Sequence, residues 1–327
     1  MSGGFFLDTY VFIRTNHFLE KMSAWQRFWI TVFPSKSFCV KEIEFSNGDK
    51  IGIVPVPEKI KLKSISKSIA QEFNGFDKVC LFDDSFSSDD DDFFTKPGFY
   101  LIPNVQSNKE AKYLFNEIFV DKLVTKAISK IPENKKINFG ISIENRLQLS
   151  EILTSIIAKN AEFLSIRVDY QSESLDEYLD LFAKEYGLES LVSVGGANAL
   201  FDCDVVLGFD LSKVTKLKRD AIVVDVRDTF KNKSRRKLIS GFDFEIKLKQ
   251  TEDTDVAKLF ELVRRRIGKE NLLLFLSAKA SNPPVCEFLY HYWIRNIDKK
   301  QVAFNSKFCE GIATGFAQIG YVTYTII

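Results

Sequence analysis

The alternation of short apolar segments with helical segments between residues 137 and 276 constrains the fold of this chain most strongly. The apolar segments contain few polar side chains, which is typical of strands buried on both faces of a parallel sheet. Because crossovers between parallel strands are right-handed, the pattern predicts an α/β fold with a doubly wound, mostly parallel sheet. The predicted strands cover residues 137–142, 163–168, 191–194, 205–209, 222–226, 242–248 and 272–276.

The segments between these strands carry apolar residues at helical spacing. They predict helices over residues 147–159, 175–186 and 256–267. Gly187 follows the second of these, at a position where glycine commonly ends a helix because it tolerates the left-handed conformation.

The first hundred residues predict a smaller α+β domain. Residues 5–13 favour a strand and residues 17–30 a helix. Asn47-Gly48 lies between two β-prone runs, and this dipeptide indicates a hairpin because it tolerates the positive φ of a tight turn. A second helix is expected over 62–73 and a short strand over 78–82.

Two domain boundaries follow from these patterns. A long helix over residues 108–130 precedes a polar break at 132–136, so residues 1–131 are expected to form the N-terminal domain with its linking helix. Residues 132–300 would then form the sheet domain. Residues 301–327 would add a helix and a β-prone strand that packs back on the N-terminal domain, because such a strand is rarely left exposed. Further helices are expected over 285–296 and 306–318.

Composition argues for a cytoplasmic protein without a nucleic-acid or membrane partner. The 45 Lys and Arg residues nearly balance 44 Asp and Glu, so the whole molecule has no strong field. The N-terminus lacks the pattern of a secretory signal, and no segment approaches the length of a membrane span. The five cysteines are scattered and odd in number, which favours reduced thiols.

Two charged segments stand out. Residues 83–92 contain six aspartates, and residues 231–237 contain five Lys and Arg residues. Both favour solvated loops, while a cation site in the first and an anion contact in the second stay open as alternatives.

Several catalytic motifs are absent from the sequence. There is no P-loop, no G-x-S-x-G nucleophile turn and no H-E-x-x-H zinc motif. The chain has only two histidines, His17 and His291. No metal site and no specific catalytic residue are therefore predicted.

Candidate cofactor-binding residues follow from the predicted sheet, because ligands of open α/β sheets bind at the carboxyl ends of the strands. Further polar residues expected at this edge are Arg227, Asp228, Ser277 and Lys279. A structural alternative stays open, since Asp residues at such junctions commonly cap helices and Gly195-Gly196 is compatible with a plain turn. The candidates are Asp169, Gly195, Gly196, Asp210 and Asp225.

Residues 137–226 resemble the dinucleotide-binding, Rossmann-type class in their order of elements. Asp169 would close the second strand, where that class keeps an acid for a ribose hydroxyl. The glycine-rich turn departs from the class, because residues 140–146 contain only Gly140, inside the predicted strand, and Glu144 would repel a phosphate.

Three hypotheses about the function of this protein remain. The first choice is a Rossmann-like binding or regulatory module with a degenerate nucleotide site, for an unknown small molecule or protein partner. The alternative is an NAD(P)-dependent oxidoreductase that acts in a cleft between two domains. Nucleic-acid binding rests only on the basic segment and ranks last. NAD(P) is the only cofactor suggested, with millimolar affinity or none.

Overall fold

The structure is a computed structural model, and it describes residues 9–16, 19–33, 40–60, 108–144, 150–170, 173–232, 237–250, 253–281, 306–319 and 322–327. The expected elements at 62–73, 78–82 and 285–296 lie outside these residues. The acidic segment 83–92 and three of the five cysteines, Cys39, Cys80 and Cys286, also lie outside them.

The chain divides into two compact units. One consists of Met1–Ala111 with Phe244–Thr323, and we call it the three-strand unit. The other consists of Lys112–Asp243 with Tyr324–Ile327, and we call it the six-strand unit. The two units do not test the predicted domain boundaries at residues 131 and 300. These boundaries stay a prediction about which parts of the chain fold independently.

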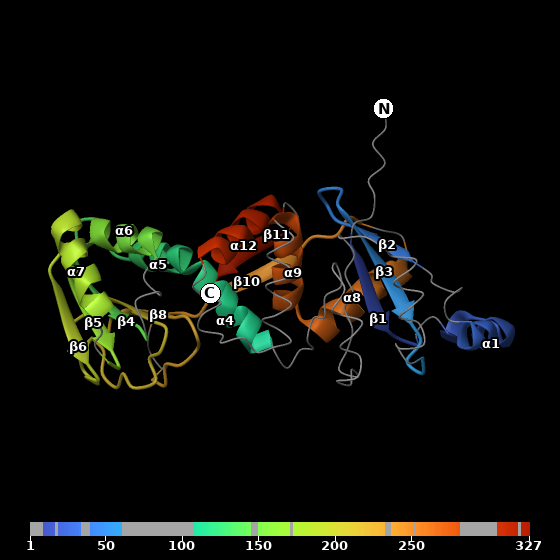
Figure 1. Ribbon diagram of the computed structural model, residues 1–327, viewed down its shortest axis with the longest axis horizontal. Coiled ribbons are helices and arrows are strands. Elements are labelled where there is room, and N and C mark those ends of the chain that lie inside the picture. The colour runs from blue at the N-terminus through green and yellow to red at the C-terminus, as the bar shows by residue number, and fades with distance from the viewer. Residues whose placement is uncertain are drawn as a thin grey trace, which may run out of the picture. The chain divides into compact units, whose positions relative to one another are not determined.

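The six-strand unit contains a parallel sheet with the order β6-β5-β4-β7-β8-β9 (Figure 1). The order runs outward from β4 in one direction and from β7 in the other. The reversal between β4 and β7 is the topological switch point of a doubly wound sheet. The predicted fold class is therefore confirmed. The strands are β4 (Ile137–Ser142), β5 (Ala161–Val168), β6 (Ser190–Val194), β7 (Val205–Gly208), β8 (Ile222–Asp225) and β9 (Lys237–Ile239).

Two kinds of segment pack against this sheet, helices and irregular connections. The helices α5 (Val120–Ile128) and α6 (Glu151–Asn160) pack side by side, α5 against β7 and β8 and α6 against β5. The connections from β6 to β9 contain no helix in their described residues. Their apolar side chains, including Leu200, Leu211 and Phe230, form a core cluster with residues of β7 and β8.

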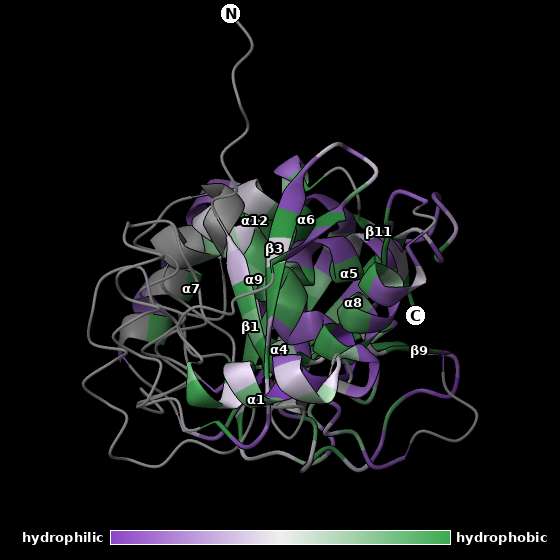
Figure 2. Ribbon diagram, turned by 90° about the vertical axis from the view of Figure 1, so that its right-hand side faces the viewer, coloured by the Kyte–Doolittle hydropathy of each residue, from purple (hydrophilic) through white to green (hydrophobic). Residues whose placement is uncertain are grey.

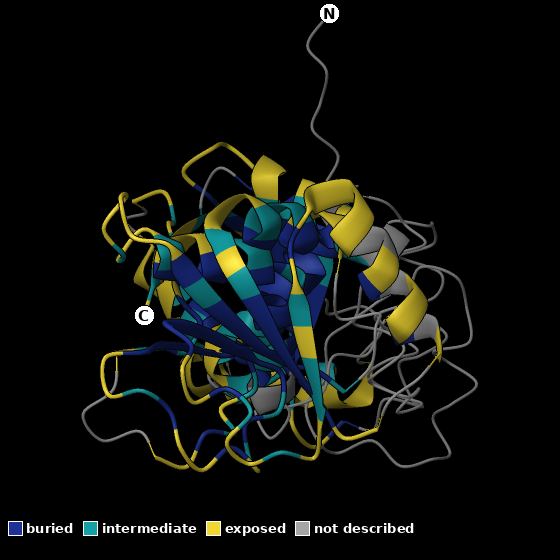
Figure 3. Cartoon of the chain, turned by 90° about the vertical axis from the view of Figure 1, so that its left-hand side faces the viewer, coloured by how far each residue is buried: buried dark blue, intermediate teal, exposed yellow. Residues whose placement is uncertain are grey.

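Burial follows the position of each strand. Every residue of β7 and β8 is buried, whereas the edge strand β6 has no buried residue (Figure 3). The helix α7 (Glu173–Tyr186) connects β5 to β6 and ends before Gly187, whose φ of 65° confirms the predicted helix end.

The three-strand unit contains a sheet of order β1-β3-β2. β1 (Tyr10–Arg14) runs parallel to β3 (Lys50–Val56), and β2 (Lys41–Glu44) runs antiparallel to β3. Figure 2 shows the hydrophobic colour along β1 and β3. The turn of the predicted hairpin is confirmed, since Gly48 has a φ of 91°.

The remaining described part of the chain also contains helical segments. The segments are the 3-10 turn Leu19–Lys21, α1 (Ala24–Val32), α8 (Thr254–Ile267) and the pair α9 (Lys269–Ser281) and α12 (Ser306–Gln318). A Cβ on Gly315 of α12 would lie 1.7 Å from the carbonyl oxygen of Ser277, so only glycine allows α9 and α12 to approach this closely.

Three expectations about elements were wrong. Residues 272–276 belong to α9, whose residues 271–278 are all buried, and a short apolar run cannot by itself distinguish a buried helix from a strand. Ser277 and Lys279 therefore leave the predicted sheet edge. The segment 242–248 does not join the parallel sheet, since β10 (Phe242–Ile246) pairs with β11 (Val322–Ile326). The helix over 108–130 is two helices, α4 (Asn108–Ile118) and α5, separated at Phe119.

None of the described helices combines the length and the apolar character that crossing a bilayer requires.

Candidate functional site

The five candidate residues follow the carboxyl ends of four strands of the six-strand unit. Asp169 follows β5, Gly195 and Gly196 follow β6, Asp210 lies two residues after β7, and Asp225 ends β8. Because these strands are parallel, the structure brings all five to the same edge of the sheet. The residues at this edge make up the carboxyl-edge site.

A buried arginine that the sequence reasoning missed organises the site. Arg167 of β5 is 1% exposed and is the largest fully buried side chain among the described residues. Its Nη1 donates to Ser142 Oγ over 3.2 Å, and its Nη2 donates to Asp169 Oδ1 over 2.8 Å. Its Nε is buried without a hydrogen-bond partner. A buried guanidinium needs such acceptors, because removing a charge from water is costly.

Asp169 is engaged on both carboxylate oxygens by cations of the same chain. Oδ1 accepts from Arg167, and Oδ2 accepts from Lys213 Nζ over 2.9 Å. These contacts, chiefly the hydrogen bond from Lys213, hold the pKa of Asp169 below its usual value. Both oxygens of the residue that the sequence predicts as a ribose-binding acid are therefore engaged by cations of the protein itself.

The Lys213–Asp169 ion pair crosses the switch point. Lys213 lies in the connection after β7 and Asp169 follows β5, while β4 lies between these two strands in the sheet. Ser142, the last residue of β4, donates from its Oγ to the carbonyl oxygen of Asp210 over 2.6 Å. The end of β4 is therefore tied to both neighbouring strand ends.

The connection from β4 to α6 contains one acidic residue, Glu144, where the class has its phosphate-binding turn. Glu144 Oε2 lies 3.1 Å from Arg227 Nη1, and Glu117 also accepts a short hydrogen bond from Arg227. Burial raises the pKa of Glu117 in spite of its pairing with Arg227. Ser150 caps α6 through a hydrogen bond from the amide of Leu153 to its side chain. Residues 145–149 lie outside the described residues.

Asp210 and Asp225 are bonded to nearby backbone groups. Asp210 Oδ1 accepts from the amide of Ser212 over 2.8 Å. Asp225 is 0% exposed, and its two oxygens accept from the amides of Thr229 and Phe230, each over 2.9 Å. These contacts fix the turn after β8.

The glycine pair forms a turn after β6. Gly195 has a φ of 66° and donates its amide to the carbonyl oxygen of Val168 over 2.8 Å. A Cβ on Gly195 would have no neighbour within 4 Å, so conformation and not space requires glycine there. A Cβ on Gly196 would lie 3.4 Å from the Cβ of Ala199, at the edge of ordinary contact. A ligand-binding role for Gly195 and Gly196 therefore stays a prediction.

The sequence reasoning named Asp169 but missed Arg167, Ser142 and Lys213. A signal for Arg167 was present, because it is the only charged residue between Phe163 and Val168 in a mostly apolar strand. Nothing local predicted Lys213, which reaches Asp169 from 44 residues away.

A pocket of about 860 Å³ lies at the other edge of the sheet, where β4 and β5 begin. Its lining includes Ile137, Ala161, Lys159 and the ion pair of Lys136 with Glu162. It is separate from the carboxyl-edge site. The described residues contain no group of three His, Cys, Asp or Glu side chains arranged to hold a metal ion.

The strand order of the six-strand unit defines a Rossmann-like α/β fold. No protein family and no curated protein matches the chain. Solved structures similar to it include a dipicolinate synthase from Bacillus halodurans, at 12% identity and a TM-score of 0.30, covering 66% of this chain and 81% of that one. The dipicolinate synthase from Bacillus subtilis has 10% identity and a TM-score of 0.33, with 71% of this chain and 87% of that one covered.

L-tryptophan dehydrogenase from Nostoc punctiforme is similar at 8% identity and a TM-score of 0.28, with 95% of this chain and 80% of that chain covered. At these values the fold class stands on the strand order of the six-strand unit alone.

Proposed function

We propose that the protein is a non-catalytic binding or regulatory module whose Rossmann-like site has lost dinucleotide binding. The observation that carries the proposal is the engagement of Asp169 by Arg167 and Lys213 across the end of β4. Asp169 therefore offers a ribose hydroxyl a carboxylate that already accepts from two cations, and the buried Arg167 has no access to water with which to replace this contact.

The phosphate-binding side of the site supports the same proposal. A dinucleotide needs backbone amides and a helix N-terminus close to its pyrophosphate. In this chain Glu144 follows β4, and Glu151 lies in the first turn of α6. Glu144 is paired with Arg227, whereas Glu151 would place a repelling negative charge beside the pyrophosphate, since like charges at short distance disfavour binding.

The experiment is a thermal-shift panel of NAD, NADP, ATP and AMP on the full chain, with Lys213→Ala as the companion variant. The proposal expects no increase in Tm for the wild type at ligand concentrations of about 1 mM, because a ligand at or below its Kd adds little stability. Removing Lys213 frees one oxygen of Asp169 but leaves Glu144 and Glu151, so the variant is also expected to show no shift. A clear increase with NAD or NADP in the wild type would support the oxidoreductase alternative instead.

The cytoplasmic location is part of the proposal. Among the described residues Cys203 carries a free thiol, and burial raises the pKa of this thiol to about 11. Mass spectrometry of freshly purified protein after alkylation is expected to find all five cysteines reduced. A disulfide would contradict this part of the proposal.

A further inference from the structure

The arginine at the end of β1 has no counterion among the described residues. Arg14 is half-buried, and its Nε is buried without a hydrogen-bond partner. The hydrogen bonds and ion pairs of the described part of the chain do not include its guanidinium group. A buried donor without an acceptor is unfavourable, and this applies more strongly to a cation. Arg14 therefore has donors left for an anion that the described residues do not supply.

Two other buried or partly buried arginines show how such groups are satisfied elsewhere in this chain. Arg167 donates from both of its Nη atoms to side chains of the six-strand unit, and Arg227 pairs with two glutamates. Acceptors of this kind offset the cost of removing a charge from water. The unbonded guanidinium group of Arg14 differs from both, and a buried polar group without a partner requires an explanation.

Arg14 lies where two parallel strands end side by side. It is the last residue of β1, and it stands opposite Val56, the last residue of β3. The amide of Thr15 continues the pairing by donating to the carbonyl oxygen of Val56 over 2.9 Å. In open α/β sheets, ligands bind outside the carboxyl ends of parallel strands. The position of Arg14 is therefore one at which a bound molecule is expected.

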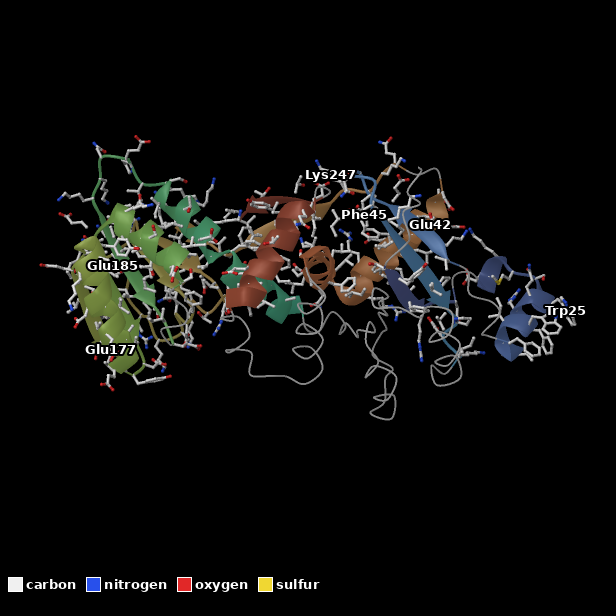
Figure 4. All side chains as sticks on the ribbon, turned by 45° about the horizontal axis from the view of Figure 1, so that its top comes forward. Trp25, Glu42, Phe45, Glu177, Glu185 and Lys247 are labelled. Atoms are coloured by element: carbon white, nitrogen blue, oxygen red, sulfur yellow. The ribbon has the colours of Figure 1, made fainter. Side chains whose placement is uncertain are left out.

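The face of the sheet that carries Arg14 is apolar. Side chains alternate along a strand, so Arg14 shares this face with Phe12 and with Val56, which are 0% and 2% exposed. The opposite face carries Phe45, which follows β2 (Figure 4) and whose ring centroid lies 6.0 Å from that of Phe260 in α8. Apolar neighbours lower the local dielectric constant, which strengthens the attraction between a guanidinium group and an anion.

The charges at this edge favour an anion. One acid, Glu58, lies next to it and is engaged by other groups. Its Oε2 accepts from Asn16 Nδ2 over 2.9 Å, and its Oε1 lies 3.9 Å from Arg266. Lys59 is exposed and adds a further cation beside Arg14. The cations outnumber the acid, so the edge attracts negative charge.

We propose that Arg14 binds an oxyanion, the carboxylate or phosphate group of a small molecule, at the carboxyl ends of β1 and β3. The planar guanidinium group presents paired N–H donors that match two oxygens of such a group. No hydrogen bond to the described residues holds the Arg14 side chain in place, so it is free to turn towards the ligand. The oxyanion site belongs to the three-strand unit and is independent of the carboxyl-edge site.

The test is thermal unfolding of the full chain in sodium phosphate and in sodium malonate, each at about 20 mM and compared with sodium chloride of equal ionic strength. The Tm of the wild type is expected to rise by about 2–3 °C in at least one of the two salts, which corresponds to a Kd of about 1 mM. A larger rise in phosphate assigns a phosphate group to the ligand, and a larger rise in malonate assigns a carboxylate.

Arg14→Met is expected to lose this rise in Tm, because methionine has no donors. Without added anion the Tm of this variant should equal or exceed that of the wild type, since an unpaired cation leaves a half-buried position. Arg265→Met is the matched control, because Arg265 is an exposed cation of α8 in the same unit, and it should keep the full rise. Lys213→Ala, in the six-strand unit, should keep it as well.

Arg14→Lys provides a second variant that keeps the charge. It is expected to retain at most about half of the rise in Tm, because lysine lacks the paired donors of the guanidinium group. Circular dichroism checks that every variant is folded. Full retention of the rise in Arg14→Lys would show that no guanidinium group is required and would contradict the proposal.

Two other outcomes overturn the proposal. One is the absence of a rise in the wild type in both salts, or an equal rise in the wild type and Arg14→Met. The other is a Tm of Arg14→Met several degrees below that of the wild type without added anion, which would assign Arg14 a structural part in the sheet.

Discussion

Lys213 and Asp169 form an ion pair with 2.9 Å between Nζ and Oδ2, although 44 residues separate them in the sequence. The pair joins the connection after β7 to the end of β5 and so passes over the end of β4. In a doubly wound sheet this is the location of the ligand crevice. The protein's own side chains therefore hold the acid on which a ribose would depend.

The ion pair is expected to stabilise the fold only slightly, because the Lys213 side chain is mostly exposed and the Asp169 side chain is 36% exposed. Lys213→Ala should lower the free energy of unfolding by less than about 1 kcal/mol at pH 7. Urea unfolding measures this value. A loss above about 2 kcal/mol would show that Lys213 is held in a buried network.

The same variant has an expected pH dependence. The pKa of Asp169 is lowered in the folded protein, mainly by Lys213, so its stabilisation is fully present above the unfolded pKa of about 3.9. It is lost as the pH falls through the lower folded pKa. The difference in unfolding free energy between wild type and Lys213→Ala should thus shrink below about pH 4. A difference that grows with acidity would contradict this assignment.

Arg167→Met should destabilise the protein by about 2–4 kcal/mol, because the change leaves Asp169 and Ser142 without a buried donor. The matched control is Arg219→Met, at an exposed position of the same unit, which should stay within about 0.5 kcal/mol of wild type. Equal effects of the two substitutions in urea unfolding would show that Arg167 does not organise the site.

Asp225 was predicted as a ligand residue, and its contacts indicate a structural part in the turn after β8. Asp225→Asn should cost about 1–3 kcal/mol, because an amide group cannot accept from the amides of Thr229 and Phe230 on both sides. Asp220→Asn at an exposed position serves as the control and should change stability little. If Asp225→Asn is as stable as wild type in thermal unfolding, the cap contributes nothing.

Gly140 of β4 should tolerate no side chain, because a Cβ there would lie 2.7 Å from Cys203 Sγ. Gly140→Ala is expected to cost about 1–3 kcal/mol. In Gly140→Ala/Cys203→Ala the loss should be smaller than the sum of the two single losses, because the second change removes the clashing atom. Strictly additive losses in urea unfolding would show that Cys203 is not the obstacle.

Much of the six-strand unit could be predicted because its strands are nearly continuous apolar runs. The segment 137–142 was predicted with the bounds of β4. β9 was missed because it begins at Lys237, the last residue of the basic segment, and only its Leu238 and Ile239 are apolar. Residues 272–276 were wrongly assigned as a strand, since a run of five apolar residues fits a buried helix equally well.

The candidate site could be located from the sequence, because strand order alone brings Asp169 to the carboxyl edge. Its chemistry could not be predicted. The contacts of Asp169 with Lys213 and of Ser142 with Asp210 join loops distant in sequence, and no local pattern encodes such pairs. A helix was expected over residues 17–30, but the exposure of the aromatic residues of α1 depends on what the rest of the fold leaves uncovered.

The central claim is that the carboxyl-edge site no longer accepts a dinucleotide. Calorimetric titration of the full-length wild type with NAD and with NADP tests it most directly. The account predicts a Kd in the millimolar range or no measurable heat of binding. A Kd in the micromolar range, lost on substitution of Asp169 by Ala, would contradict the claim.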